Sequence, residues 1–414
     1  MSFFNDGGMT RGQLALPRTP SPDRLPLFGL LALATAGFVT IMTEALPAGI
    51  LPAMSSDLGV SESAVGQTVT VYAIGSAVAA VPLTAATVGW PRRRLLLTTI
   101  AGFAVANTIT AVSDNYILTL LARFAAGVVA GLLWALLAGY ARRIVAPAQR
   151  GRAMAIAMAG TPVALSIGVP AGTFLAGLAG WRVAFGFLTA LAVVLAVWVF
   201  QAVPDFPGQT KDERLPLRHT LRVPGVAAVL FVTSTFVLAH NLLYTYIAPY
   251  LARNGLGDHV DAVLLVFGIA ALVSICLTGV LINRHLRMLM IANCTLFAGA
   301  ALVLGLFAVG PWLVLASVAA WGIAFGGAAT VLQTASAEAA GTVGDVAQSL
   351  VVTCWNIGIA AGGMAGGILL SRLGPYSLPR AALALLLAAL LVTVAAWRHG
   401  FPGYSRRSER EASA

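Results

Sequence analysis

Charged side chains are scarce in this chain of 414 residues: 10% are Asp, Glu, Lys or Arg, whereas 59% are hydrophobic. Soluble globular domains carry about 25% charged residues, so the composition excludes a water-soluble fold. Lysine occurs once, at Lys211, and every other basic residue is an arginine. The three cysteines lie in apolar stretches, and their odd number argues against a disulfide framework. We interpret them as small packing residues.

Motifs of hydrolytic or metal chemistry are also absent. The sequence has no HExxH, no GxSxG and no His/Cys cluster, so we predict no catalytic residue, no metal site and no cofactor. The net charge of +10 suggests nucleic acid at first sight. However, the basic residues lie between apolar stretches rather than in one patch, which argues against a nucleic-acid partner.

Long apolar stretches are what the chain has instead. They recur between Leu27 and Trp397, and each is long enough to cross a hydrocarbon core of roughly 30 Å at about 1.5 Å per residue. We predict an all-α membrane protein with twelve transmembrane helices. The expected spans are 27–53, 64–88, 95–112, 116–140, 153–177, 183–203, 224–250, 260–282, 288–308, 311–335, 346–370 and 379–398.

One long polar break, 204–223, divides these spans six and six. It predicts two six-helix bundles, 27–203 and 224–398, joined by a cytoplasmic linker and flanked by polar tails at 1–26 and 399–414. Twenty of the 25 Lys and Arg residues fall in segments that would share one side of the membrane, and four fall on the other side. The positive-inside rule then places both termini in the cytoplasm. The first tail is polar and Pro-rich, which does not fit a cleavable signal peptide.

The two halves resemble each other at an offset of 195 residues. Without gaps, this offset aligns Gly127 with Gly322, Gly131 with Gly326, Gly168 with Gly363, Gly172 with Gly367 and Arg92 with Arg287. Both copies begin and end on the same side, so the pattern predicts a parallel duplication of a six-helix unit.

Away from the span ends, the charged and histidine side chains inside the predicted spans are three: Glu44, Arg123 and His240. A charged residue at the centre of a span costs roughly 2.5–3.5 kcal/mol on insertion scales, so such a residue is a functional candidate by default. We predict that these three take part in proton coupling.

Glu44 is the only carboxylate among them, and it shares a helical face with Thr40 and Pro47. Pro47 has no amide hydrogen and therefore frees the carbonyl of Thr43. The face is polar and locally broken, as the wall of a cavity would be, and a carboxylate removed from water gains a proton more readily. The alternative interpretation is a structural hydrogen bond to a neighbouring helix.

Arg123 lies on one stripe with Gly127, Gly131 and Trp134. Glycines permit close approach of helices. Because arginine stays charged in protein sites, Arg123 needs a carboxylate, carbonyl groups or water. Besides a role in coupling, a snorkelling or helix-bridging arginine is possible.

His240 and Tyr244 share a face in FVLAHNLLYTYIAPYL. Histidine titrates near physiological pH, and an aromatic and polar cluster suits a flat polar solute. A structural histidine bonded to a backbone carbonyl is the alternative. The residues predicted to bind the solute are Thr40, Trp134, His240, Asn241, Tyr244, Gln333 and Asn356.

The stretch AMAGTPVALSIGVPAGTFLAG places Gly160, Gly168 and Gly172 at multiples of four residues. Pro162 and Pro170 remove amide donors and permit bending. We predict a close-packed, kinked helix that slides during a conformational change. The residues predicted for conformational or packing roles are Arg92, Arg93, Gly127, Gly160, Gly168, Pro170 and Gly172.

Over residues 27–398 the chain resembles the major facilitator superfamily, specifically its bacterial drug:proton antiporter branch of arabinose- and nucleoside-efflux permeases and chloramphenicol exporters. The resemblance rests on TEALPAGILPAMSSDLGVSESAVGQTVTVYAIGSAVAAVPLTA, on the spacing of Arg123 and Gly127, and on a degenerate antiporter signature at Gly160, Gly168, Pro170 and Gly172. The segment GWPRRR departs from the family pattern, because it lacks the aspartate that precedes the arginines.

The resemblance implies proton-coupled efflux of a small polar or amphipathic solute, such as a sugar, nucleoside or antibiotic, by alternating access. It also implies a multi-pass protein of the bacterial inner membrane. The expected partners are the solute, protons and the lipid bilayer, and the expected state is a monomer. Uptake by symport and a membrane sensor without transport are the alternatives, and an intramembrane enzyme is disfavoured.

Overall fold

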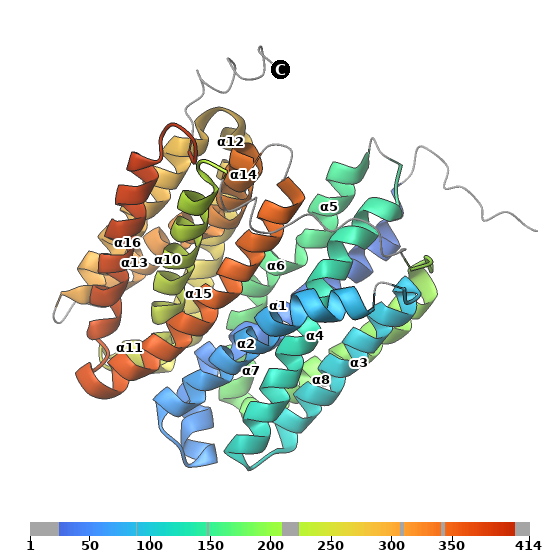
Figure 1. The fold of residues 1–414 in the computed structure, drawn as a ribbon. Helices are drawn as coiled ribbons and strands as arrows, with labels where there is room; N and C mark the ends of the chain where they lie inside the picture. The colour runs from blue at the N-terminus through green and yellow to red at the C-terminus, as the bar shows by residue number, and fades with distance from the viewer. Residues whose placement is uncertain are drawn as a thin grey trace, which may run out of the picture.

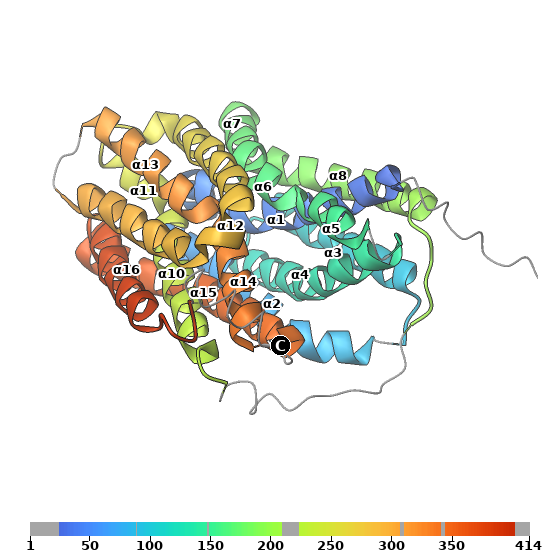
Figure 2. The ribbon, with the colours of Figure 1, turned by 90° about the horizontal axis from the view of Figure 1, so that it is seen from above.

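The computed structural model describes residues 25–87, 89–146, 149–208, 223–306, 310–340 and 344–401. Within these ranges the ordered elements are helices, and twelve helical stretches are long and apolar enough to cross a membrane. This confirms the predicted fold class. Figures 1 and 2 show two helical bundles side by side, the first coloured blue to light green and the second yellow-green to red.

The first bundle contains α1 (Leu27–Leu58), α2 (Glu62–Ala86), α3 (Arg92–Val112), α4 (Tyr116–Arg143), α5 (Arg150–Met158), α6 (Gly160–Val163), a π-helical turn (Ala164–Gly168), α7 (Val169–Ala179) and α8 (Trp181–Ala202). The second contains α10 (Val226–Tyr244), α11 (Ile247–Ala252), α12 (Val260–Gly305), α13 (Pro311–Gly326), α14 (Ala328–Ala340), α15 (Gly344–Leu373) and α16 (Ser377–Ala395). Successive spans run in opposite directions, so alternate connections lie at the same end of the molecule.

Three of the predicted spans are interrupted. The span at 153–177 is divided among α5, α6, the π-helical turn and α7, which is the local break that its two prolines predict. The span at 224–250 breaks at Thr245 and Tyr246, between α10 and α11. The span at 311–335 breaks at Gly327 and continues to Ala340.

The predicted break at 283–287 is present, although it contains no loop. The element α12 consists of two helices that meet at His285, where φ is −130° and ψ is 29°. The two membrane-length stretches on either side are Gly257–Ile282 and Arg284–Gly305. Arg284 and Arg287 therefore belong to the start of the second stretch, next to the break.

The prediction that Glu44 is the only carboxylate in a span needs correction, because Asp261 lies in the predicted span 260–282 and the helices are longer than expected. Membrane-length stretches within the described residues also include Asp57, Glu62, Asp258, Asp261 and Glu338. Each of these lies within a few residues of the end of its stretch. Glu44 alone among them lies deep in a helix.

The 195-residue repeat is visible in the packing of the two bundles. A Cβ atom built on Gly127 would lie 1.9 Å from the carbonyl oxygen of Tyr72, and one built on Gly322 would lie 2.4 Å from that of Phe267. Tyr72 and Phe267 are themselves 195 residues apart. The next turn repeats the relation, with Gly131 against Ser76 and Gly326 against Ala271. The crossing of α2 with α4 thus recurs as the crossing of α12 with α13.

Candidate functional site

Arg123 on α4 binds the backbone of α1 at its break. The side chain is fully buried. Its Nη1 donates to the carbonyl of Thr43 and its Nη2 donates to the carbonyl of Glu44 at 3.2 Å. The Thr43 carbonyl is the acceptor that Pro47 leaves without a helical donor. The guanidinium also lies over the ring of Tyr72, 4.9 Å from its centroid.

Glu44 lies next to this break and is only half-buried. The ion pairs found within the described residues join Arg182 to Asp57 and Asp114, so Arg123 holds the Glu44 backbone rather than its carboxylate. Helix α1, which carries Glu44, packs on α11 and α12 of the second bundle. Glu44 therefore lies on a helix that contacts both bundles.

Two further hydrogen bonds hold α1 at this point. The hydroxyl of Tyr72 donates to the carbonyl of Thr40 at 3.2 Å, and the amide of Asn107 donates to the hydroxyl of Thr43 at 3.0 Å. The hydroxyl of Thr40 donates to the carbonyl of Ala36, and the Thr40 side chain is fully buried. Thr40 therefore faces the interior of the first bundle.

His240 lies at the centre of an aromatic cluster in the second bundle, which we call the His240 cluster; its members are His240, Tyr244, Phe267, Trp321 and Phe325. The imidazole stacks on Phe325 with ring centroids 3.5 Å apart and on Tyr244 at 5.0 Å. The indole Nε1 of Trp321 donates to Nδ1 of His240 at 3.2 Å. The bonded nitrogen is thus an acceptor, which places the proton of the neutral imidazole on Nε2.

Tyr244 carries the polar group of this cluster. It is buried, and its hydroxyl has no hydrogen-bond partner among the described residues. Tyr244 ends α10, and α11, which follows it, packs on α1, the helix that carries Glu44.

The other predicted solute-binding residues lie apart from this cluster. Trp134 is half-buried beside Gly37 of α1. Asn241 and Asn356 are buried, and each amide donates to a carbonyl four residues earlier in its own helix, at 2.9 and 3.0 Å. Gln333 is exposed on α14.

The glycines predicted for packing face α1. A Cβ atom would lie 1.8 Å from the carbonyl oxygen of Ala34 if built on Gly160, and 2.5 Å from Sδ of Met42 if built on Gly168. Gly172 approaches Leu46 in the same way, at 2.8 Å, and Pro170 is buried in the first turn of α7. The bent segment from α6 to α7 therefore packs closely on the helix that carries Glu44.

The basic segment before α3 acquires an acidic partner from outside its own motif. The backbone amide of Arg93 donates to Oδ1 of Asp205 at 3.0 Å, and that of Arg92 donates to the carbonyl of Phe206 at 2.9 Å. A carboxylate at a helix N-terminus is favourable because free amide groups and the helix dipole face it. The aspartate missing from GWPRRR is thus replaced by one that follows α8.

A set of hydrogen bonds joins the two bundles, and we call it the latch; its residues are Ser63, Gln67, Tyr246, Gly363 and Gly367. The hydroxyl of Ser63 on α2 donates to the carbonyl of Gly367 on α15 at 2.9 Å, which joins the bundles. Within the second bundle, the hydroxyl of Tyr246 donates to the carbonyl of Gly363 at 2.7 Å. The amide of Gln67 lies 3.4 Å from both the Tyr246 hydroxyl and the Gly363 carbonyl. Sequence reasoning named the two glycines as repeat positions but missed their partners.

The latch lies at the end of the molecule where α1 ends and α2 begins, and we call this the latch end. Across the bundles, α1, α2, α6 and α7 pack on α11, α12 and α15, and the pairs with extensive contact do not include α5 or α14 in the described part of the chain. The bundles are thus held together from the middle of the helices to the latch end. The arginines near Arg92 lie at the opposite end.

Two repeated helical bundles, with a carboxylate at a helix break between them, define a twelve-helix solute transporter. The family model described as Major Facilitator Superfamily matches residues 33–347, and the chain belongs to this family.

Three similar proteins illustrate the relationship. The chain is 32% identical over 355 residues to a chloramphenicol efflux pump of Mycobacterium tuberculosis, covering 83% of this chain and 86% of that one. It is 29% identical over 360 residues to the purine ribonucleoside efflux pump NepI of Escherichia coli, covering 85% and 90%. A bacterial homologue of the human lysosomal transporter Spinster, solved in an inward-facing and occupied conformation, matches with a TM-score of 0.67 at 15% identity, covering 89% and 96%. The protein is therefore a membrane transporter with efflux-pump relatives rather than an enzyme.

Proposed function

We propose that this transporter exports a small polar or amphipathic solute in exchange for protons, with Glu44 as the proton-binding group. The observation that carries the proposal is the position of Glu44. Its backbone is held by Arg123 at the Pro47 break of α1, and α1 packs on α11 and α12 of the opposite bundle. A proton bound there changes the electrostatic energy of both bundles at once, which is what coupling requires.

Arg123 is the positioning residue in this scheme. When Glu44 is ionised, its negative charge offsets the positive charge of the Arg123 guanidinium. When Glu44 is protonated, the positive charge is balanced only by the carbonyl dipoles of α1 and the faces of nearby rings. The two protonation states therefore favour different positions of α1 relative to α4, and this difference can be used to drive the change of access.

We infer that the solute contains a flat ring with hydroxyl groups. The named solutes of two relatives, chloramphenicol and purine ribonucleosides, both have this character. In this chain the His240 cluster supplies aromatic surface, and the Tyr244 hydroxyl has an unused hydrogen-bonding capacity in the described structure. Aromatic contacts with a small number of placed polar groups are typical of such sites.

The direction of coupling can be tested in proteoliposomes with radiolabelled chloramphenicol and inosine. An interior-acid pH gradient should drive solute uptake into the vesicles, whichever way the protein is inserted, because protons leave as solute enters. Uptake by symport would instead require an exterior-acid gradient. Acceleration by an exterior-acid gradient alone would contradict export.

The role of Glu44 is tested by Glu44→Gln, which resembles the protonated carboxyl group in shape. In an antiporter the proton and the solute bind alternately. We therefore expect the variant to bind solute at every pH with the affinity that the parent protein shows at low pH. Gradient-driven uptake should be lost, while solute exchange without a gradient continues. Glu62→Gln, in the first turn of α2, is the matched control and should behave like the parent. Normal gradient-driven uptake by Glu44→Gln would assign the proton to another group.

We further propose that the protein works as a monomer in the bacterial inner membrane, with both termini and the end of the molecule near Arg92 in the cytoplasm. The distribution of arginine supports this orientation. A cysteine replacing Trp90, which is 44% exposed, should react with an impermeant thiol reagent in inverted membranes but not in intact cells, after removal of the native cysteines. Reaction in intact cells would reverse the orientation.

A further inference from the structure

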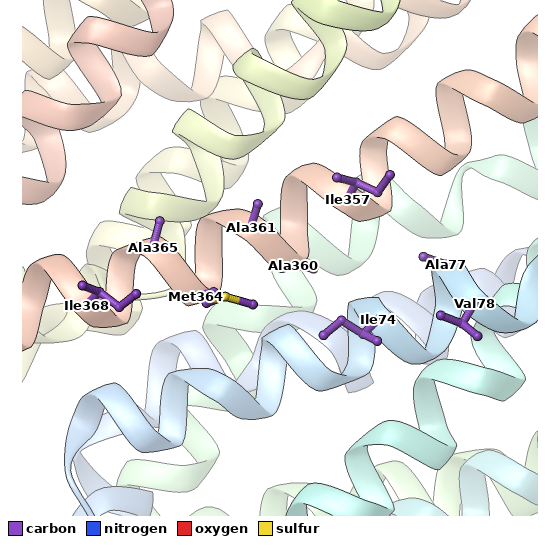
Figure 3. Close-up of a pocket in the computed structure, with 9 residues that line it drawn as sticks. All are labelled: Ile74, Ala77, Val78, Ile357, Ala360, Ala361, Met364, Ala365 and Ile368. Atoms are coloured by element: carbon purple, nitrogen blue, oxygen red, sulfur yellow. The ribbon is translucent and has the colours of Figure 1, made fainter.

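An apolar groove lies between α2 and α15, starting beside the latch and extending away from the latch end. It is formed by Ile74, Ala77 and Val78 on α2 and by Ile357, Ala360, Ala361, Met364, Ala365 and Ile368 on α15. Figure 3 shows these side chains along the two helices. The volume of about 540 Å³ lies within the range of about 300–1,000 Å³ that is usual for sites of small molecules.

The lining defines what can occupy the groove. All nine side chains are aliphatic or thioether groups, so none of them offers a strong hydrogen-bond donor or acceptor. A water molecule needs two to four polar partners to remain in such a site. The rim is nonetheless accessible, since Val78 is 63% exposed and Ile357 and Ile368 are each 51% exposed. Both helices cross the membrane, and the accessible medium at this depth is hydrocarbon.

A charged and an aromatic residue follow the end of α2, and they indicate that the molecule in the groove also has a polar, anionic part. From Val78 the helix runs eight residues to Ala86, or about 12 Å. The following turn presents Trp90, and the guanidinium of Arg94 lies over its ring, 5.9 Å from the centroid. Arg94 is exposed. Tryptophan and arginine at this position are typical of the membrane interface, where lipid phosphate groups lie.

We propose that the groove binds one acyl chain of an anionic phospholipid whose phosphate lies near Trp90 and Arg94. The apolar lining holds the chain, and the arginine provides a charge complementary to the headgroup. The leaflet is the one on the side of the molecule opposite the latch end. The proposal concerns a lipid and does not depend on which solute is transported or on the coupling ion.

The position of the groove gives the lipid a conformational effect. The latch joins Ser63 to Gly367 and Gln67 to Gly363. On α15 the lining of the groove begins among these glycines, and on α2 it begins two turns beyond Gln67. If the bundles close at the opposite end, the parts of α2 and α15 that line the groove must approach each other. A lipid chain that binds only when they are apart stabilises the latched arrangement by linkage.

The site can be tested by photolabelling of the full-length protein in phosphatidylcholine vesicles that contain phosphatidylglycerol with a diazirine on one acyl chain. Adducts mapped by mass spectrometry should concentrate on residues 74–78 and 357–368. Leu391 on α16, which is 70% exposed, provides the reference for general lipid contact. We expect about fivefold enrichment over this reference, equivalent to about 1 kcal/mol of preference.

Two variants fill the groove from opposite walls: Ala361→Phe on α15 and Ala77→Leu on α2. Either should reduce groove adducts to the level of Leu391. Ala384→Phe, at an exposed alanine of α16, is the matched control and should leave the pattern unchanged. Uniform labelling of all lipid-facing residues in the unsubstituted protein would overturn the proposal, whatever the variants do. Cross-links between two protein chains through α2 and α15 would also overturn it, because the groove would then be a protein interface.

Discussion

Removing one hydroxyl from the latch should measurably shift the equilibrium between a closed form, in which its hydrogen bonds between the bundles are made, and an open form, in which they are broken. Tyr246→Phe removes the hydroxyl that accepts from the Gln67 amide across the bundles at 3.4 Å, and it keeps the ring. The 2.7 Å bond from the same hydroxyl to the Gly363 carbonyl lies within the second bundle and is lost in both forms. Tyr246 is fully buried. A net loss of about 1 kcal/mol, usual for a buried neutral hydrogen bond, corresponds to about a fivefold increase in the open population.

The bonds within the latch are not equivalent. Gln67 and Tyr246 share the Gly363 carbonyl and contact each other, so their substitutions should not be additive. Ser63 bonds to a different carbonyl, that of Gly367. Ser63→Ala should therefore add nearly its full effect to Tyr246→Phe, and together they should raise the open population about 25-fold if each costs about 1 kcal/mol.

The open population can be read from the reactivity of one buried cysteine. Thr70 lies just beyond the latch, is 2% exposed and faces Gly363. Thr70→Cys, in a background without Cys276, Cys294 and Cys354, should react with a maleimide only when the latch opens. In purified protein the initial rate should rise about fivefold with Tyr246→Phe.

The control substitution makes the same chemical change at the same end of the molecule. The hydroxyl of Tyr376 donates to Asn254 at 3.4 Å, entirely within the second bundle. Tyr376→Phe should leave the maleimide rate of Thr70→Cys unchanged. An unchanged rate with Tyr246→Phe, in protein of normal melting temperature, would refute a role of the latch in opening.

Three further outcomes follow from the geometry. Arg123→Lys replaces two directed donors with a point charge. We expect a lower melting temperature, because each lost hydrogen bond to a charged group contributes about 1.5–3 kcal/mol. We also expect loss of gradient-driven transport. Gly127→Ala should destabilise the first bundle by at least about 1–3 kcal/mol, because the new Cβ atom would meet the Tyr72 carbonyl. At Gly139 nothing lies within 4 Å of an added Cβ atom. Gly139→Ala should therefore be neutral or stabilising in thermal unfolding. His240→Ala should weaken solute binding about fivefold in titration calorimetry if the His240 cluster binds the solute, and an unchanged affinity with a lower melting temperature would assign His240 to structure.

Local features of the sequence predicted local features of the structure. The lack of an amide hydrogen at Pro47 predicted a free carbonyl at Thr43, and the structure provides Arg123 as its donor. A buried arginine needs a carboxylate, carbonyl groups or water, and Arg123 is bound by carbonyl groups. The glycine repeat also extends to its contact partners, since Tyr72 and Phe267 occupy equivalent positions. Covalent geometry and periodicity are properties of short segments, so they can be read from a sequence.

Features that depend on distant segments were missed. Gln67 lies 179 residues from Tyr246 and 296 from Gly363, and no pattern within one helix specifies that contact. The same reason applies to Asp205, which lies 112 residues from the Arg93 amide that it accepts from. The aromatic partners of His240 come from α12 and α13. In each case the partner is chosen by tertiary packing among many chemically similar residues.

The position of α1 connects the proposed proton site at Glu44 to the contact between the bundles. Gly49 lies two residues beyond Pro47, and a Cβ atom there would be 2.1 Å from Oγ1 of Thr173 on α7 and 3.2 Å from Leu264 on α12. The part of α1 beyond the break is therefore held between the two bundles, while the part before it is held by Arg123 and Tyr72. Interfaces packed this closely shift between discrete arrangements rather than deforming gradually. A change of charge at Glu44 acts at the junction of the two parts, so a small movement there must alter the packing of α1 on α12 and, through it, the latch end.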